Sequence, residues 1–212
     1  MIRAVTYNSF DGMRVRAILS LPQAESVRLP ALLVADHRKG IRVWGNEQPL
    51  EANQWGNRAV LIVEVIDRGT RALEQNLRSF TDDDALHHMR RQAMIVGTTI
   101  ESMQVYELLR SIDLLRSLPE VDGSRITVTG RFQDGVNGLY ASLLDGRVHE
   151  VILGSPPASH TQGPHYLGIL RYTDIPKFIK LMRARIKMYG DTALNLSSER
   201  RCASLAACLS KQ

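Results

Sequence analysis

Short apolar runs alternate with amphipathic stretches along most of the chain, and this pattern predicts strands and helices in turn. Apolar side chains occupy every second position from Met13 to Leu19, as in a strand with one buried face. The runs Pro30–Ala35 and Ala59–Ile66 are apolar almost throughout, which is typical of strands buried on both faces of a sheet. Apolar residues at helical spacing then predict a long helix from Thr98 to about Leu118, where Pro119 ends it.

The order of the predicted elements indicates the fold class. Strands are expected at Ile2–Tyr7, Met13–Leu21, Pro30–Ala35, Ala59–Ile66, Arg125–Thr129, Val148–Leu153 and Ile186–Tyr189. Further helices are expected at Pro49–Trp55, from Asp82 to Arg91, and at Val136–Leu144, Thr173–Arg183 and Ser198–Ser210. A turn at Asp11-Gly12 joins the first two strands as a hairpin. We therefore expect a single α/β domain over residues 1–212, with a mostly parallel sheet flanked by helices and an N-terminal β-hairpin.

Composition restricts the class of protein. Of the 212 residues, 44% are hydrophobic and 23% charged, which suits a chain with a buried core and excludes global disorder. The longest apolar runs, Ala31–Ala35 and Ala59–Val63, are far shorter than the ~20 residues that cross a bilayer. The first residues show no apolar export signal. We therefore expect a cytoplasmic protein with no membrane partner.

Basic residues exceed acidic ones without forming a cluster. The formal net charge is +5, and 22 of the 27 basic residues are arginine. They stand singly or in pairs, such as Arg90–Arg91 and Arg200–Arg201, with acidic residues between them. A nucleic-acid-binding surface usually combines a basic stripe with interleaved aromatics, and aromatics make up only 6% of this chain. No nucleic-acid partner is expected.

The two cysteines, Cys202 and Cys208, fall in the predicted C-terminal helix. At helical rise their Cα atoms would lie roughly 9 Å apart, beyond the reach of a disulfide. We therefore expect reduced cysteines and no zinc site. The chain also lacks a phosphate-binding loop and a dinucleotide-binding glycine motif after a strand, so no cofactor is expected.

Ligands of parallel α/β sheets bind beyond the carboxyl ends of the strands, and this rule selects candidate positions. The expected pocket residues, all directly after predicted strands, are His37, Asp67, Arg68, Phe132 and Gln133. A second group follows the last two strands and comprises Ser155, Ser159, His160, His165 and Asp191.

The stretch from Glu120 to Gly135 resembles the nucleophile elbow of α/β-hydrolases, most closely in the acetyl xylan esterase and dienelactone hydrolase-like branch. Its turn reads Gly130-Arg-Phe-Gln-Asp-Gly135, where the branch has Gly-x-Ser-x-Gly-Gly. Other landmarks agree over nearly the whole chain: Asp11-Gly12, Asp67-Arg-Gly-Thr70, Tyr140–Val148 and the Pro-Pro-x-Ser-His160 loop. The resemblance implies an α/β-hydrolase fold and, where the motif is intact, Ser-His-Asp ester hydrolysis.

This chain departs from the family motif at the catalytic positions. Phe132 stands where the nucleophilic serine belongs and Asp134 where a glycine belongs. A phenyl ring cannot attack a carbonyl, and Asp134 lies past the tip of the elbow. Asp191 resembles the acid of the triad, but the last histidine of the chain is His165, whereas the family's histidine follows the acid. We therefore expect a C-terminally shortened fold with a degenerate catalytic set.

Three hypotheses follow. The leading one is a binding or assembly module that takes a small ester or acyl ligand and has lost ester hydrolysis. The alternative is an active carboxylic-ester hydrolase with a relocated site, in which Ser155 or Ser159 works with His160 or His165. A metal ion at these histidines is not expected, because no carboxylate or cysteine lies at ligand spacing. The third is a homo-oligomer that pairs through an open sheet edge beside Ile186–Tyr189.

Overall fold

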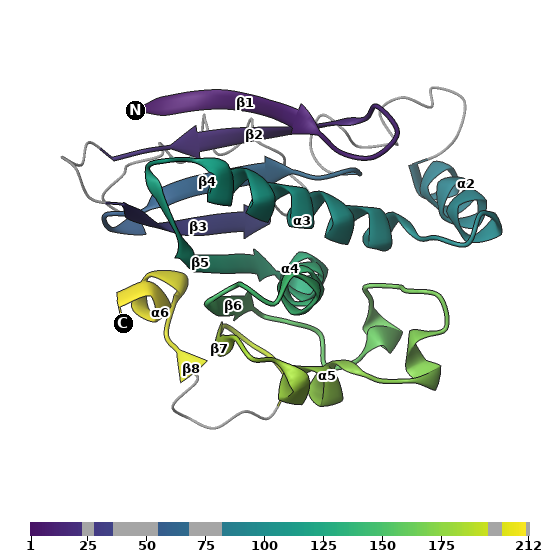
Figure 1. The fold of residues 1–212 in the computed structure, drawn as a ribbon. Coiled ribbons are helices and arrows are strands. Elements are labelled where there is room, and N and C mark those ends of the chain that lie inside the picture. The colour runs from purple at the N-terminus through teal and green to yellow at the C-terminus, as the bar shows by residue number, and fades with distance from the viewer. Residues whose placement is uncertain (23–27, 36–54, 68–81, 195–200, 211–212) are drawn as a thin grey trace.

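An eight-stranded sheet forms the centre of the molecule (Figure 1). The computed structural model describes residues 1–22, 28–35, 55–67, 82–194 and 201–210, with the backbone alone for 82–86. The strands are β1 (Ile2–Asn8), β2 (Arg14–Ser20), β3 (Leu29–Ala35), β4 (Ala59–Glu64), β5 (Val121–Arg131), β6 (Glu150–Gly154), β7 (Arg185–Tyr189) and β8 (Arg201–Cys202). Their spatial order is β1-β2-β4-β3-β5-β6-β7-β8. The pairs β1–β2 and β2–β4 are antiparallel and the others parallel, which confirms the predicted mostly parallel sheet with an N-terminal hairpin.

Helices cover both faces of this sheet. They are α2 (Asp82–Ile95), α3 (Ile100–Ser117), α4 (Phe132–Asp145), α5 (Ile175–Leu181) and α6 (Leu205–Ser210), with 3-10 turns η4 (His160–Gln162) and η5 (Ile169–Arg171). Figure 1 shows α3 running alongside β3 and β4. The helices α3, α4 and α5 pack on one face with Leu33 of β3, whereas Leu32 faces the opposite side and shares a second core with Cys208 of α6. Because side chains alternate along a strand, β3 is buried on both faces, as its apolar sequence predicts.

The long central helix begins and ends where its sequence indicates. Thr99 caps it, because its side-chain oxygen accepts a hydrogen bond from the Ser102 N–H at 3.0 Å. It ends at Ser117, before Pro119. None of the helices in the described ranges is both long and apolar enough to cross a membrane.

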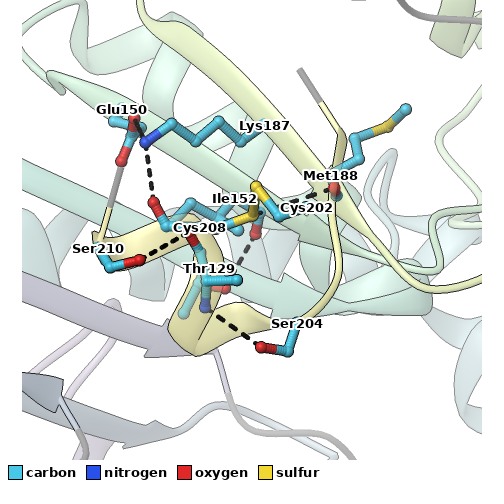
Figure 2. Close-up of a disulfide and its surroundings, with 10 residues drawn as sticks. Thr129, Glu150, Ile152, Lys187, Met188, Cys202, Ser204, Cys208 and Ser210 are labelled. Carbon is cyan, nitrogen blue, oxygen red and sulfur yellow. Dashed lines mark hydrogen bonds and ion pairs between the residues drawn. A yellow bond between two sulfur atoms is a disulfide. The ribbon is translucent and has the colours of Figure 1, made fainter. Parts of the chain in front are cut away.

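The C-terminal part differs from the prediction. The expected helix over Ser198–Ser210 is wrong in its described part, 201–210, because residues 201–202 form strand β8 beside β7 and the helix there spans 205–210. The chain reverses between the two elements and brings the Cα atoms of Cys202 and Cys208 to 5.3 Å. A disulfide joins them (Figure 2), so the expectation of reduced cysteines is also wrong. Since Tyr189 pairs with Cys202, the carboxyl end of β7 is not an open edge.

Candidate functional site

The elbow at the carboxyl end of β5 is built by two glycines. The strand ends at Arg131 and helix α4 starts at Phe132, with no linker between them. A Cβ atom on Gly130 would lie 2.8 Å from the Gly135 nitrogen, and a Cβ on Gly135 would lie 2.6 Å from the Gly130 oxygen. No side chain fits at either position, so the backbone can turn this sharply only with glycine at both. The strand–turn–helix predicted for an elbow is therefore present.

Phe132 occupies the tip of this elbow. Its φ is +50°, a region that bulky side chains rarely adopt. The residue is 40% exposed, and the guanidinium carbon of Arg131 lies 5.2 Å from its ring centroid. The elbow thus presents an apolar ring beside a cation, where the family motif presents a hydroxyl.

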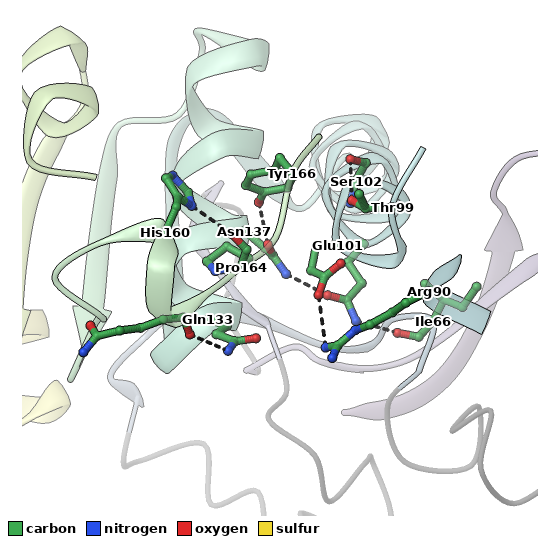
Figure 3. Close-up of polar contacts among 12 residues, drawn as sticks. Ile66, Arg90, Thr99, Glu101, Ser102, Gln133, Asn137, His160, Pro164 and Tyr166 are labelled. Carbon is green, nitrogen blue, oxygen red and sulfur yellow. Dashed lines mark hydrogen bonds and ion pairs between the residues drawn. The ribbon is translucent and has the colours of Figure 1, made fainter. Parts of the chain in front are cut away.

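The neighbours of Phe132 point elsewhere. Asp134 is buried in the first turn of α4, so its carboxylate does not reach the sheet edge. The Gln133 side chain donates a hydrogen bond from Nε2 to the Gln162 carbonyl at 2.9 Å (Figure 3). Gln133 therefore ties the elbow to turn η4.

His160 is enclosed and both of its ring nitrogens are engaged. It is 3% exposed; Nδ1 lies 2.9 Å from the Pro164 carbonyl and Nε2 lies 2.8 Å from the Tyr140 hydroxyl. A carbonyl only accepts, so Nδ1 carries the proton and Nε2 accepts from Tyr140. Burial lowers the pKa of His160, against the opposing influence of the Pro164 hydrogen bond and of Asp174. The neutral ring is positioned by these bonds as a structural link between α4 and the loop after β6.

Ser159 caps turn η4, since its side chain accepts a hydrogen bond from the Thr161 N–H. It also contacts Asp174. Burial, the largest single influence, would raise the pKa of Asp174, but hydrogen bonds from Ser159 and from the N–H groups of His160 and Ile175 together lower it. Ser159 and Asp174 are thus joined in a local cap rather than aimed at a ligand.

Ser155 follows β6 directly and has a φ of +43°. Its N–H donates to the Tyr189 carbonyl at 2.9 Å, and its hydroxyl lies against Gly190. His165 is exposed. In the part of the chain that the structure describes, no hydrogen bond joins Ser155 or Ser159 to the imidazole of His160 or His165.

The remaining candidates fall in two separate surface pockets. Exposed Asp191 lines one of about 570 Å³ together with Arg201 and Gln162. His160 and His165 line another of about 300 Å³. The structure therefore does not bring Asp191 and these histidines to one pocket. His37 and Arg68 lie outside the described residues, as does the expected helix Pro49–Trp55 except for Trp55.

The structure contains a buried polar network beneath the elbow that the sequence analysis does not predict. The Tyr166 hydroxyl donates to Asn137 Oδ1 at 2.6 Å, Asn137 Nδ2 donates to Gln104 Oε1 at 2.7 Å, and Gln104 Nε2 donates to the Ile66 carbonyl at 2.8 Å (Figure 3). Glu107 accepts from the Ile66 N–H at 2.7 Å. Both backbone groups of Ile66 are thereby held by α3, which fixes the point where the chain enters the loop after β4.

Asp67 and two partly buried tyrosines lie in or next to this network, in the chain or in space. Asp67 comes next in the chain and has a φ of +61°. Burial raises the pKa of Tyr166 well above its usual value, and raises that of Tyr140 to about 12. Both hydroxyls therefore keep their protons and act as hydrogen-bond donors. Within the described ranges, no three His, Cys, Asp or Glu side chains group closely enough to hold a metal ion.

Comparison with known proteins agrees with the elbow and the sheet. The family model "Acetyl xylan esterase (AXE1)" matches residues 2–193, whereas no curated protein sequence matches the chain. Among solved structures, the acetyl xylan esterase from Paenibacillus sp. R4 is 20% identical with a TM-score of 0.60; the alignment covers 89% of this chain and 67% of that one. Acetyl xylan esterase 1 from Thermoanaerobacterium sp. JW/SL YS485 is 16% identical, with a TM-score of 0.60 and coverage of 88% and 66%.

A third similar structure shows that a similar fold also occurs as part of a longer protein. The Pyrococcus horikoshii acylaminoacyl peptidase is 15% identical with a TM-score of 0.58, and the alignment covers 89% of this chain and 32% of the peptidase. At these identities the structural likeness shows the fold alone. The chain spans about two thirds of the length of the two esterases. From the match over residues 2–193 and the fold that it shares with these structures, the chain belongs to the acetyl xylan esterase (AXE1) family of α/β-hydrolases.

Proposed function

We propose that this family member binds a small ester or acyl ligand at its elbow without hydrolysing it. The observation that carries the proposal is Phe132 at the elbow tip, with a φ of +50° and a ring that is 40% exposed. Ester hydrolysis of the family type needs a hydroxyl at this point, activated by an imidazole. A phenyl side chain has neither a proton to give up nor an electron pair with which to attack.

The surroundings of Phe132 support a ligand with an acyl group. An apolar methyl or acyl chain gains about 25 cal/mol for each Å² of apolar surface that it buries against the ring. The guanidinium of Arg131, which lies beside the same ring, can donate a hydrogen bond to a carbonyl oxygen. An apolar surface next to a cationic donor matches the two ends of an ester's acyl part, the alkyl group and the carbonyl oxygen. Because the similar structures are named acetyl xylan esterases, an acetylated sugar is the first ligand to test.

Three measurements test the proposal. The protein should hydrolyse p-nitrophenyl acetate no faster than a heat-unfolded sample, and a fluorophosphonate probe should label no serine. In saturation-transfer NMR, acetylated xylose should give a signal at its acetyl methyl group, and plain xylose should give none. Phe132→Ala should abolish that signal, whereas Tyr172→Ala, which removes an aromatic ring that is 83% exposed, should keep it. Labelling of a single serine, or a signal insensitive to Phe132→Ala, would overturn the proposal.

An active ester hydrolase with a relocated Ser/His site is the second candidate. Ser155 favours it, because a non-glycine residue with a φ of +43° stands at the carboxyl end of a central strand, and such strained backbone is common in active sites. This candidate expects a fluorophosphonate adduct on Ser155 or Ser159 that His160→Gln or His165→Ala prevents. A protein that stays unlabelled while a family esterase reacts under the same conditions excludes it.

Strand β1 supports a separate proposal, that the protein self-associates. It lies at the edge of the sheet and is seven residues long. A strand at a sheet edge can pair with a second copy of the chain. We therefore propose a homo-oligomer in which β1 pairs with β1 of another copy.

A further inference from the structure

The Cys202–Cys208 disulfide links two elements that are too short to be stable alone. Cys202 belongs to the two-residue strand β8 and is partly exposed, whereas Cys208 belongs to the six-residue helix α6 and is fully buried. Isolated helices of this length do not persist in water. Figure 2 shows the disulfide between β8 and α6, beside strand β7. The disulfide therefore joins a partly exposed cysteine to a fully buried one.

Helix α6 covers the face of the sheet opposite α3 and α4. Its buried apolar contribution is Cys208 and Leu209, which pack with Leu32, Ile62 and Ile152, and the partly buried Leu205 packs against the same cluster. Three side chains are a small contribution, because apolar burial stabilises in proportion to the area covered. The attachment of α6 thus depends on additional contacts.

Two cations supply those contacts. Lys187 Nζ donates to the Cys208 carbonyl at 2.9 Å, and Arg58 donates to the Leu209 carbonyl at 2.9 Å. The last carbonyls of a helix carry partial negative charge and are stabilised by such cations. Lys187 also forms an ion pair of 2.8 Å with Glu150, which is fully buried. Cys208 therefore lies at the centre of the attachment of α6: its side chain forms the disulfide and its carbonyl binds the cation that neutralises Glu150.

We propose that Cys202–Cys208 is a thiol–disulfide exchange site for a small dithiol or a dithiol protein, and that its reduction releases α6 from the sheet. This inference goes beyond ligand binding at the elbow and does not depend on it. Reduction removes the covalent link, and it leaves α6 held by the apolar side chains of Leu205, Cys208 and Leu209 and by two hydrogen bonds. Release uncovers the apolar side chains of β3, β4 and β6 on that face and opens the Glu150–Lys187 pair to water.

The exposure of the two cysteines determines the direction of the exchange. A thiolate of the dithiol attacks Sγ of Cys202, the more exposed cysteine; a new S–S bond forms and Cys208 leaves as a thiolate, which takes up a proton. The second thiol of the reagent loses its proton and attacks the mixed disulfide, and Cys202 leaves as a thiolate that is protonated in turn. The dithiol is oxidised to its own disulfide, and the protein gains two electrons and two protons.

Dithiothreitol tests the proposal on the folded protein. Without the reagent, iodoacetamide should modify neither cysteine. After treatment in native buffer it should modify both, as mass spectrometry detects. Hydrogen exchange at the Cys208 amide, which donates to the Ser204 carbonyl at 3.0 Å, should accelerate at least tenfold upon reduction. The Cys202→Ser variant should exchange rapidly at this amide with or without dithiothreitol.

A matched variant separates the disulfide from a general weakening of α6. Ser210→Ala removes the side-chain hydrogen bond to the Ala207 carbonyl but keeps both cysteines, so its exchange should stay slow until dithiothreitol is added. Two results would overturn the proposal. One is a disulfide that is reduced only in denaturant; the other is complete reduction with unchanged protection of the Cys208 amide.

Discussion

Replacing the buried Asn137 by alanine should destabilise the protein more than replacing an exposed polar residue of the same helix. The side chain is 1% exposed and makes two hydrogen bonds, one from the Tyr166 hydroxyl and one to Gln104. The truncation leaves both partner groups without a hydrogen bond in the interior, at about 1–3 kcal/mol each. The expected loss is therefore about 2–6 kcal/mol, a large share of the ~5–15 kcal/mol that typically stabilises a domain.

Urea unfolding followed by tryptophan fluorescence measures this loss, and a domain of this size should lose roughly 4–24 °C in Tm. Gln133→Ala is the control, because it removes a hydrogen bond from the same helix at an exposed site and should change stability by less than about 1 kcal/mol. A double-mutant cycle of Asn137→Ala with Tyr166→Phe should give a coupling of about 0.5–3 kcal/mol. Additive losses, or an Asn137→Ala variant as stable as the control, would refute the reasoning.

Three further predictions concern charge and assembly. Burial lowers the pKa of His160 below its usual value, so the stability that its neutral form provides is present above the unfolded pKa and is lost as the pH falls through the lowered folded pKa. Chemical denaturation between pH 8 and pH 5 should therefore show a steeper decline of stability in the parent protein than in His160→Gln. Equal slopes would contradict this. Lys187→Met should lower the free energy of unfolding by about 3–5 kcal/mol, because it leaves the Glu150 carboxylate buried without its ion-pair partner. The double variant Lys187→Met/Glu150→Leu should recover most of this stability. A double variant as unstable as the single one would count against the ion-pair argument. If β1 pairs with a second copy, light scattering should show an oligomer that Ile2→Lys weakens, and a strict monomer at high concentration rules this out.

The sequence predicts the sheet well because local periodicity and burial agree there. The run Ala59–Ile66 is apolar except for Glu64, and β4 is buried on both faces. The elbow is also predictable, since Gly130 and Gly135 are needed within one short turn. In each case, residues close in the chain determine the structure.

The C-terminal part and the polar network are not predictable in this way. Cys202 and Cys208 fit one helix by spacing, but the structure places them in a strand and a helix because of contacts with β7 and the sheet face. Gln104 and Asn137 lie on buried helix faces, and their partners are separated from them by tens of residues in the chain. Polar residues on apolar helix faces were the available signal, but it does not identify their partners.

The two glycines of the elbow separate the shape of the turn from its chemistry. Gly130 and Gly135 determine how closely the strand and helix approach, whereas the side chain at position 132 only projects from the turn that they form. The turn can therefore persist through changes of residue 132 that abolish a reaction. For protein engineering, this makes position 132 a single point at which a nucleophilic side chain can be introduced on a backbone that already has the required curvature.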